Sequence, residues 1–267
     1  LEGTPHRGGT FTVRINVEPS GLTRIHDQMS EGTMARLTVG PIYETLAELD
    51  RDTHPRYTLK PLLAESWTES DDHLTLTVKL RRGVRFHNGQ AFTSKDVKAV
   101  LDVVLDEKNL TTSFRSYFTD LDSYAAVDAH TFVIKWKRPY FLANRNFLTA
   151  VPMMPAAALD GDFDTLALHR LPIGTGPFRF LGWETGRAIT LGRNDDYWGP
   201  KAWLDKVVIR VVKDETVATQ LWEKGEFDLM TRIQPAVWRG LESKDAQNQW
   251  AWKKYHRVTF AENIYGW

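Results

Sequence analysis

The stretch Gly174-Thr175-Gly176-Pro177-Phe178-Arg179-Phe180 decides the fold. Its glycines and proline predict a tight turn, and a strand is expected directly after it, over residues 178–183. The Gly-x-Gly opening also begins the fingerprint of dinucleotide-binding sites. The third glycine of that fingerprint would fall at Arg179, and a helix rather than a strand would have to follow. The stretch therefore favours a turn that leads into a sheet over a phosphate-binding loop.

Length and composition narrow the class of protein. The chain has 267 residues, of which 42% are apolar and 25% are charged, so it can bury a core as one large domain or two modest ones. The 34 Lys and Arg balance the 34 Asp and Glu, which argues against a broad nucleic-acid-binding surface or a polybasic membrane anchor. Cysteine is absent, which excludes disulfides, thiolate zinc sites and thiol nucleophiles. No apolar run approaches the ~18 residues of a membrane span.

Hydrophobic periodicity predicts alternating strands and helices, with a strand–helix–strand order in the last third of the chain. In the first strand, the apolar residues from Phe11 to Val17 share one face, which predicts burial on one side only. Eight of the ten tryptophans lie from Trp183 onward, where they serve a core or a binding surface. The expected strands are 10–17, 73–80, 124–137 (a pair), 178–183, 188–191, 207–212, 226–230 and 258–264, with a strand or turn at 58–67, and the expected helices are 33–49, one opening at 93–96, 141–148, 214–224 and 235–241.

No arrangement of side chains in the sequence predicts catalysis or a resident metal. The eight histidines include no His-Glu-x-x-His pair, and no Gly-x-Ser-x-Gly elbow is present. The run 160–164 resembles the start of a calcium-binding loop, but its sixth position is Thr165 and its twelfth is Leu171 instead of Gly and Glu. A binding protein is therefore favoured over an enzyme.

Two stretches carry a resemblance to a known family. One runs from Leu80 to Val97, and the other joins the opening turn to Asn194-Asp195-Asp196-Tyr197-Trp198-Gly199. In order and spacing they resemble the family-5 extracellular solute-binding proteins, the dipeptide- and oligopeptide-binding components of bacterial ABC importers. Supporting matches are 63–67 (Leu-Ala-Glu-Ser-Trp) and 225–228 (Gly-Glu-Phe-Asp). We interpret the first stretch as architecture, because it reads as a strand, a tight turn and a helix capped at Thr93 or Ser94.

The resemblance implies an α/β fold of the periplasmic binding protein type II-like class. It implies a first lobe with an inserted α+β subdomain, and a second lobe that is missing because family members are considerably longer. We expect residues 1–42 and 159–267 to form the discontinuous lobe and residues 43–158 to form the insertion. We interpret the start at Leu1 as a processed or cloned end, which leaves room for an export signal or a lipid anchor upstream.

The function implied by the resemblance is extracytoplasmic binding of a solute, above all a peptide, in the periplasm or on a membrane anchor. The two lobes would close on the ligand and deliver it to the permease subunits of an ABC transporter. The resemblance implies no cofactor, metal, catalytic residue or nucleic-acid partner. Dipeptides, oligopeptides, nickel complexes, opines and oligosaccharides remain open as ligands. The alternatives are a sensing or interaction module on the same fold without transport and, behind it, a hydrolase for which no nucleophile–base pair is visible.

The position of the resemblance also points to one wall of a ligand cleft. A pocket can read a peptide backbone through strand-like hydrogen bonds, and Arg232 can bind a carboxylate through two parallel bonds. As plain alternatives, Glu31 and Arg232 are surface charges, and Tyr265 and Trp267 are core residues. The expected ligand-binding residues are Met29, Ser30, Glu31, Phe114, Tyr117, Thr231, Arg232, Tyr265 and Trp267.

Overall fold

The computed structural model describes residues 6–29, 38–53, 55–230, 235, 236 and 239 of the chain. Its strands are β1 (Thr10–Ile15), β2 (Ala47–Leu49), β3 (Leu59–Pro61), β4 (Ala64–Glu69), β5 (Thr75–Leu80), β6 (Leu121–Asp128), β7 (Thr131–Trp136), β8 (Phe178–Glu184), β9 (Ala188–Arg193), β10 (Lys206–Val211) and β11 (Leu229–Met230). Its α-helices are α2 (Ser94–Leu105), α3 (Thr112–Arg115), α4 (Ala143–Ala150) and α5 (Glu215–Glu223). Short 3-10 segments are η1 (Arg51–Thr53), η2 (Ser116–Phe118), η3 (Ala156–Ala158), η4 (Phe163–Thr165) and η5 (Ala167–His169).

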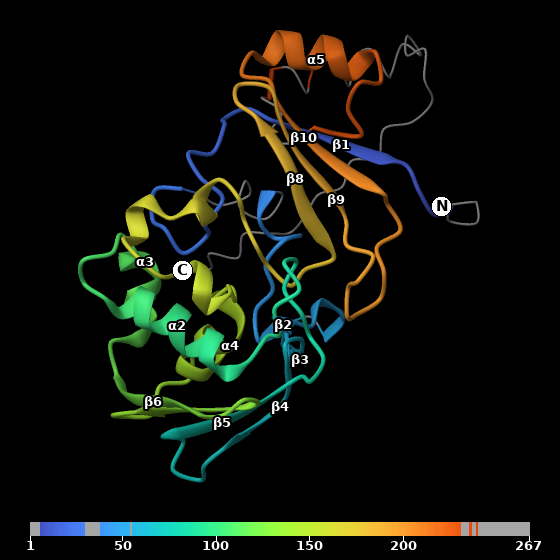
Figure 1. Ribbon diagram of the computed structural model, residues 1–267. Coiled ribbons are helices and arrows are strands. Elements are labelled where there is room, and N and C mark those ends of the chain that lie inside the picture. Colours follow the sequence, from blue (N-terminus) through green and yellow to red (C-terminus); the bar gives the residue numbers. More distant parts are fainter. Residues whose placement is uncertain (1–5, 30–37, 54, 231–234, 237–238, 240–267) are drawn as a thin grey trace.

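The described strands form two main sheets and one small pair (Figure 1). One sheet has five strands in the order β11-β1-β10-β9-β8, another has four in the order β4-β5-β7-β6, and β2 pairs with β3. Figure 1 shows the five-stranded sheet at the top beside α5, and the four-stranded sheet at the bottom with α2 and α4 above it. The predicted α/β class is confirmed.

Parallel pairing places the ends of three strands at one edge of the five-stranded sheet. Strand β1 runs parallel to both of its neighbours, with Ile15 beside Val211 of β10 and Arg14 beside Met230 of β11. The other two strands, β9 and β8, continue the sheet in antiparallel order. Because β1, β10 and β11 point the same way, their carboxyl ends lie at the same edge of the sheet.

Arg14 corrects the expectation that the first strand is buried on one side only. Strand β1 buries Val13, Arg14 and Ile15 in succession, whereas Val17 lies beyond the strand and is 59% exposed. The Arg14 guanidinium donates to the carbonyl of Val212 at 2.8 Å and to the Glu215 carboxylate, at the first residue of α5, at 2.9 Å. A buried charge is stable when it is paired and hydrogen-bonded in this way, so the connection from β10 to α5 and the first residue of α5 allow Arg14 to be buried.

The four-stranded sheet follows the predicted alternation. Leu76 and Val78 of β5 lie directly opposite Ile134 and Phe132 of β7, and all four side chains are buried on the face that α2 covers. The expected cap of the following helix is confirmed, because the Thr93 N–H donates to the carboxylate of Asp96 at 2.7 Å.

The expected helix over residues 33–49 is wrong from residue 39 onward, where the chain forms turns and irregular structure up to residue 46. Residues 47–49 form strand β2, which pairs in antiparallel fashion with β3, and residues 33–37 lie outside the described part of the chain. A helix would need the carbonyls of Pro41 and Ile42 for bonds within the segment. Instead, these carbonyls accept the N–H groups of Phe178 and Gly176, which belong to the opening turn.

Glycine is required where that turn meets the 41–42 backbone. A Cβ atom on Gly174 would lie 2.0 Å from the Ile42 carbonyl oxygen, and one on Gly176 would lie 2.4 Å from the Pro41 carbonyl oxygen. Both distances are far inside van der Waals contact, so no other residue fits without a shift of the backbone. The Gly-x-Gly pattern is therefore explained by close packing of two chain segments.

His87 fastens the same turn to the segment that precedes α2. Its backbone N–H donates to the Gly174 carbonyl at 2.9 Å. Its ring Nδ1 accepts the Gly174 N–H at 3.3 Å, and its Nε2 lies 3.0 Å from the Gly176 carbonyl oxygen. A carbonyl only accepts, so the neutral ring carries its proton on Nε2. Burial lowers the pKa of His87, and the Arg179 guanidinium lowers it further.

The second stretch that resembles the family, which contains Tyr197 and Trp198, also contributes to the interior of the protein. The Glu44 carboxylate is buried and accepts from the Tyr197 hydroxyl at 2.6 Å and from the Trp198 indole at 2.9 Å. Burial raises the pKa of Glu44, and these two donors oppose that rise. The Arg81 guanidinium lies over the Trp198 ring, 4.8 Å from its centre. Thus the Tyr-Trp pair connects residues of three distant segments.

The close contact of the glycines predicts a large effect of a small substitution. Gly176→Ala should lower the free energy of unfolding by about 2 kcal/mol or more, because the added methyl group overlaps backbone atoms that cannot rotate away. Gly182→Ala in strand β8 is the matched control, since a Cβ there meets nothing within 4 Å. Urea unfolding followed by tryptophan fluorescence measures both. Equal losses in the two variants would contradict the packing explanation.

His87 predicts a fall in stability in mild acid. Its pKa is lowered from 6.5 in the folded state, so the unfolded state binds the proton more readily. The stability contributed by the neutral ring is present above that value and is lost as the pH falls below it. His87→Gln keeps a donor for the Gly176 carbonyl and should show a shallower loss in urea unfolding between about pH 7.5 and about pH 5. The control is His6→Gln at an exposed site, which should keep the wild-type slope.

Candidate functional site

The candidate site lies at the edge where β1, β10 and β11 end. In open α/β sheets, ligands bind in a crevice outside the carboxyl ends of the strands. The described chain leaves this edge through residues 16–29, which we call the ligand-side loop. Two of the segments predicted to bind ligand, 29–31 and 231–232, follow β1 and β11, which are neighbours in the sheet.

The ligand-side loop is fastened to itself and to the protein below it. The Ser20 hydroxyl donates to the Gln28 carbonyl at 2.7 Å, which closes the base of the loop. The Met29 side chain covers Gly21, where an added Cβ would lie 2.3 Å from the Met29 sulfur. The Leu22 N–H donates to the His169 carbonyl at 2.8 Å. These contacts fix the position of the loop from Ser20 to Met29.

Asp27 connects the ligand-side loop to α3. Its carboxylate accepts the backbone N–H groups of Thr112 at 2.7 Å and Ser113 at 3.1 Å, which are the first two residues of that helix. Its own N–H donates to the Leu110 carbonyl at 2.8 Å. A carboxylate at the start of a helix satisfies free N–H groups and interacts favourably with the helix dipole. Three hydrogen bonds therefore hold together two segments that lie 85 residues apart.

The Asp27 contacts bring three of the predicted ligand-binding residues into one region. Met29 is two residues from Asp27 and half-buried, and Phe114 lies in the helix that Asp27 caps. The Phe114 and Tyr117 rings are 6.0 Å apart, edge to face, and Tyr117 is 38% exposed. The other predicted ligand-binding residues lie outside the described part of the chain: Ser30, Glu31, Thr231, Arg232, Tyr265 and Trp267.

Two buried histidines lie beneath the ligand-side loop. His26 belongs to the loop itself and His169 to η5, and their rings are 5.4 Å apart, edge to face. The His26 ring also stacks on Phe163 at 5.6 Å. Burial lowers the pKa of His169; the Phe163 carbonyl and Asp164 oppose that change, and His26 adds to it. The loop therefore rests on two titratable rings that are almost inaccessible to solvent.

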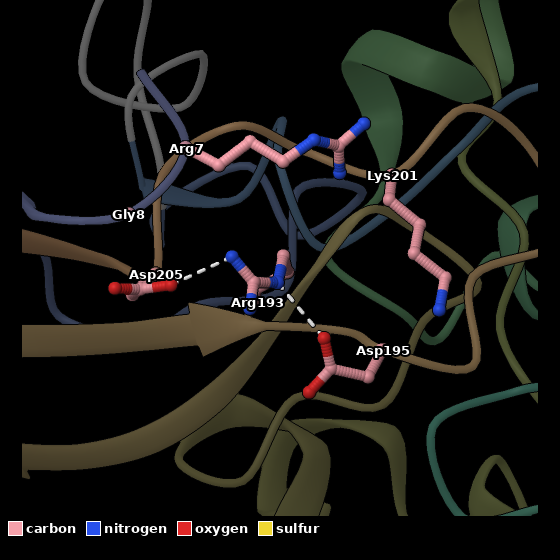
Figure 2. Close-up of a pocket in the computed structure, with 6 residues that line it drawn as sticks. All are labelled: Arg7, Gly8, Arg193, Asp195, Lys201 and Asp205. Atoms are coloured by element: carbon pink, nitrogen blue, oxygen red, sulfur yellow. Dashed lines mark hydrogen bonds and ion pairs between the residues drawn. The ribbon is translucent and has the colours of Figure 1, made fainter.

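A hollow lined by charged side chains lies at the opposite edge of the sheet (Figure 2). It has a volume of about 420 Å³ and is lined by Arg7, Gly8, Arg193, Asp195, Lys201 and Asp205, around the start of β1 and β10. Arg193 donates to the Asp195 carboxylate at 2.8 Å and to the Asp205 carboxylate at 2.7 Å. Asp205 also accepts the Gly9 N–H at 2.9 Å. These bonds hold the first strand in register, so we assign the hollow an architectural role.

A second hollow of about 520 Å³ lies beside the β6–β7 turn and is lined by residues such as Lys79, Asp128 and His130. Among the described residues, no group of three or more His, Cys, Asp or Glu side chains is placed to hold a metal ion. Within the same residues, none of the helices has the length and apolar character needed to cross a bilayer. The described residues of the candidate site offer hydrogen bonds at Asp27 and an aromatic contact at Phe114 and Tyr117.

Sequence reasoning missed Asp27, His26 and His169. Each contacts residues that are distant in the sequence, as Asp27 does with the start of α3 and His169 does with Thr23 at 2.8 Å. The only local signal is the run Thr111-Thr112-Ser113, which favours a helix start but does not say which acid caps it.

Comparison with known proteins supports the resemblance seen in the sequence. Residues 58–264 match the family model described as bacterial extracellular solute-binding proteins, family 5 Middle. The glutathione-binding protein GsiB of Escherichia coli O1:K1 is 32% identical over 210 residues, which are 78% of this chain and 40% of the relative. The chain thus spans about 40% of the length of the curated relatives that it matches.

Solved structures give the same result for the fold. The ABC transporter-associated periplasmic binding protein DppA from Helicobacter pylori, in complex with peptide STSA, is 27% identical with a TM-score of 0.76, over 90% of this chain and 49% of its own. The binding protein MoaA from A. tumefaciens R10, in complex with mannopinic acid, is 27% identical with a TM-score of 0.77, over 90% and 48%. The periplasmic binding protein fold expected from the sequence is confirmed.

The Asp27 contacts predict that this one side chain orders the predicted ligand-binding region. Asp27→Ala removes both acceptors of the α3 amides and should lower the free energy of unfolding by about 1 kcal/mol. Hydrogen exchange at residues 20–29 and 110–117 should speed up together, whereas Asp27→Asn should have a smaller effect. Asp71→Asn, at an exposed turn, is the control. If exchange rose in only one of the two segments, Asp27 would not be the connection between them.

Proposed function

The chain belongs to the bacterial extracellular solute-binding proteins of family 5, and we propose that it forms one wall of a cleft that binds a peptide or a peptide-like solute outside the cytoplasm. The whole protein would deliver this ligand to the permease subunits of an ABC transporter. The observation that carries the proposal is the Asp27 connection. It holds Met29, which ends the described part of the loop after β1, in one region with the Phe114–Tyr117 pair. In α/β sheets, ligands bind beyond the carboxyl ends of the strands, where this loop begins.

The ligand class follows from the chemistry of this region and from its relatives. The relatives above bind glutathione, which is a tripeptide, the peptide STSA, and mannopinic acid. Exposed aromatic rings such as Tyr117 accept varied side chains, because they offer a wide apolar face and a single polar tip. A short peptide with charged termini is therefore the ligand class that we propose, and a transported opine is a second ligand with support among the relatives.

The two sheets suggest how the wall is built. We propose that residues 1–42 and 159–267 form the first lobe, which contains the five-stranded sheet, and that residues 43–158 form an insertion around the four-stranded sheet. The loop 174–176 and Asp27 both cross this proposed boundary, since they bond to His87 and to Thr112, respectively. The insertion is then a rigid support for the ligand-side loop instead of an independent domain.

Closure of the cleft is the proposed mechanism of recognition. A ligand that contacts both walls binds the closed arrangement better than the open one and shifts the population toward it. The contribution of this chain is a preordered wall, because Ser20, Gly21 and Asp27 fix the ligand-side loop by bonds and packing. A preordered loop loses less conformational entropy when the ligand binds.

Calorimetric titration of the full-length protein with glutathione and with the tetrapeptide Ser-Thr-Ser-Ala tests the proposal. We expect saturable binding of at least one of them. Tyr117→Ala should weaken that binding about tenfold, as expected for an aromatic contact at a ligand surface. Tyr140→Ala is the matched control, because Tyr140 is also exposed, at 47%, but lies before α4.

Two outcomes would contradict the proposal in different ways. If neither peptide produces saturable heat, the peptide class is wrong and opines are the next ligands to titrate. If Tyr117→Ala and Tyr140→Ala weaken binding equally, the Phe114–Tyr117 pair is not part of the ligand-binding wall.

A further inference from the structure

The ring of His26 is buried in the ligand-side loop. Its residue is 4% exposed, and its ring Nδ1 accepts the Gln28 backbone N–H at 3.2 Å. The proton of the neutral ring therefore sits on Nε2, which lies 3.4 Å from the Asp164 carboxylate. The Gln28 bond shapes the ligand-side loop one residue before Met29.

His169 meets the same loop from below. It is 6% exposed, its Nε2 lies 2.6 Å from the Phe163 carbonyl oxygen, and its Nδ1 lies 2.8 Å from the Thr23 hydroxyl. The carbonyl requires a donor, so the neutral ring carries its proton on Nε2 and accepts from Thr23 on Nδ1. Protonation of Nδ1 reverses the Thr23 bond and places a charge in a buried site.

Only one carboxylate faces the two rings in the described structure. Asp164 of η4 lies beside His26, with its side chain 46% exposed, and it is the acidic group that acts on His169 as well. The other facing groups are neutral: the Thr23 hydroxyl, the Gln28 N–H and the Phe163 carbonyl. An exposed carboxylate does little to offset a positive charge on the buried His169 ring, whose own hydrogen-bond partners are a hydroxyl and a carbonyl. The His169 ring is therefore favoured in its neutral form.

We propose that His169 is a positioning residue that holds the ligand-side loop in place when neutral and releases it in mild acid, with the His26 ring of the loop packed against it. Where the proposed function holds, ligand affinity falls with the pH, because the released loop no longer presents Met29 or, through Asp27, the start of α3. This second statement rests on the proposed function, whereas release of the loop does not.

The direction of the effect follows from linkage. Burial lowers the pKa of His169 below the ordinary value of 6.5, so the opened loop binds a proton more readily than the closed one. The closed loop is favoured above that pH and loses this advantage as the pH falls below it. Each pH unit in this range changes the opening equilibrium by up to about tenfold for each proton taken up.

Hydrogen exchange read by mass spectrometry tests the release in the full-length protein. After correction for the intrinsic rate, protection at residues 22–29 and 112–115 should fall about tenfold between about pH 7.5 and about pH 5.5. In the double variant His26→Asn, His169→Gln, the fall should disappear, because these amides keep an acceptor for Gln28 and a donor for Phe163 but do not titrate. His130→Gln, at the half-buried β6–β7 turn, is the control and should keep the wild-type fall.

A second measurement needs no variant, in case the double substitution does not fold. Exchange of the imidazole C2 hydrogen reports the titration of each histidine in the wild-type protein. The midpoint for His169 should coincide with the loss of loop protection. A loop whose protection does not change over this range, or a fall that persists in the double variant, would overturn the proposal.

Titration of glutathione and Ser-Thr-Ser-Ala at the same two pH values separates this proposal from the proposed function. Affinity that falls with pH in the wild-type protein but not in the double variant supports both. If neither peptide binds at about pH 7.5, the proposed ligand class fails while the exchange result still decides whether the histidines release the loop.

Discussion

The approach of the 174–176 backbone to the carbonyls of Pro41 and Ile42 is the constraint on which the rest of the structure depends. These two segments touch so closely that only glycine fits at positions 174 and 176. The turn continues directly into β8, and its carbonyls and amides also bind His87, which precedes α2. One short loop thus fixes the five-stranded sheet, the start of the 43–53 segment and the helix layer relative to one another (Figure 1).

Buried polar groups reinforce this junction at longer range. Arg14 pairs with Glu215, Glu44 accepts from Tyr197 and Trp198, and each contact joins elements more than 100 residues apart. A buried charge without a partner is costly, so each of these groups has a low free energy in only one arrangement of the chain. The apolar cores supply most of the stability, and the polar contacts select which core arrangement forms.

Local signals in the sequence predicted the elements that depend on local physics. The alternation around Val78, the cap at Thr93 and the turn at Gly174 were all readable, because a few neighbouring residues determine each of them. The expected helix over 33–49 failed because the carbonyls of Pro41 and Ile42 bond to a turn 134 residues or more along the chain, a choice that no window of the local sequence contains. Burial of Arg14 was missed for the same reason, since its partners come from the start of α5.

The candidate site shows even more clearly that the local sequence does not predict long-range contacts. Met29, Phe114 and Tyr117 were reached through a family resemblance, whereas the groups that hold them, Asp27 and the His26–His169 pair, have no local signature. The frame of the protein is fastened by close backbone contacts at Gly174 and Gly176 and by the ring of His87, while the ligand-side loop is fastened by the carboxylate of Asp27 and by packing on two imidazoles. Because the two sets of contacts share no residue, the loop can lose order locally while the frame persists. Such a division suits a binding protein, whose frame must persist through many cycles while its ligand contacts form and break.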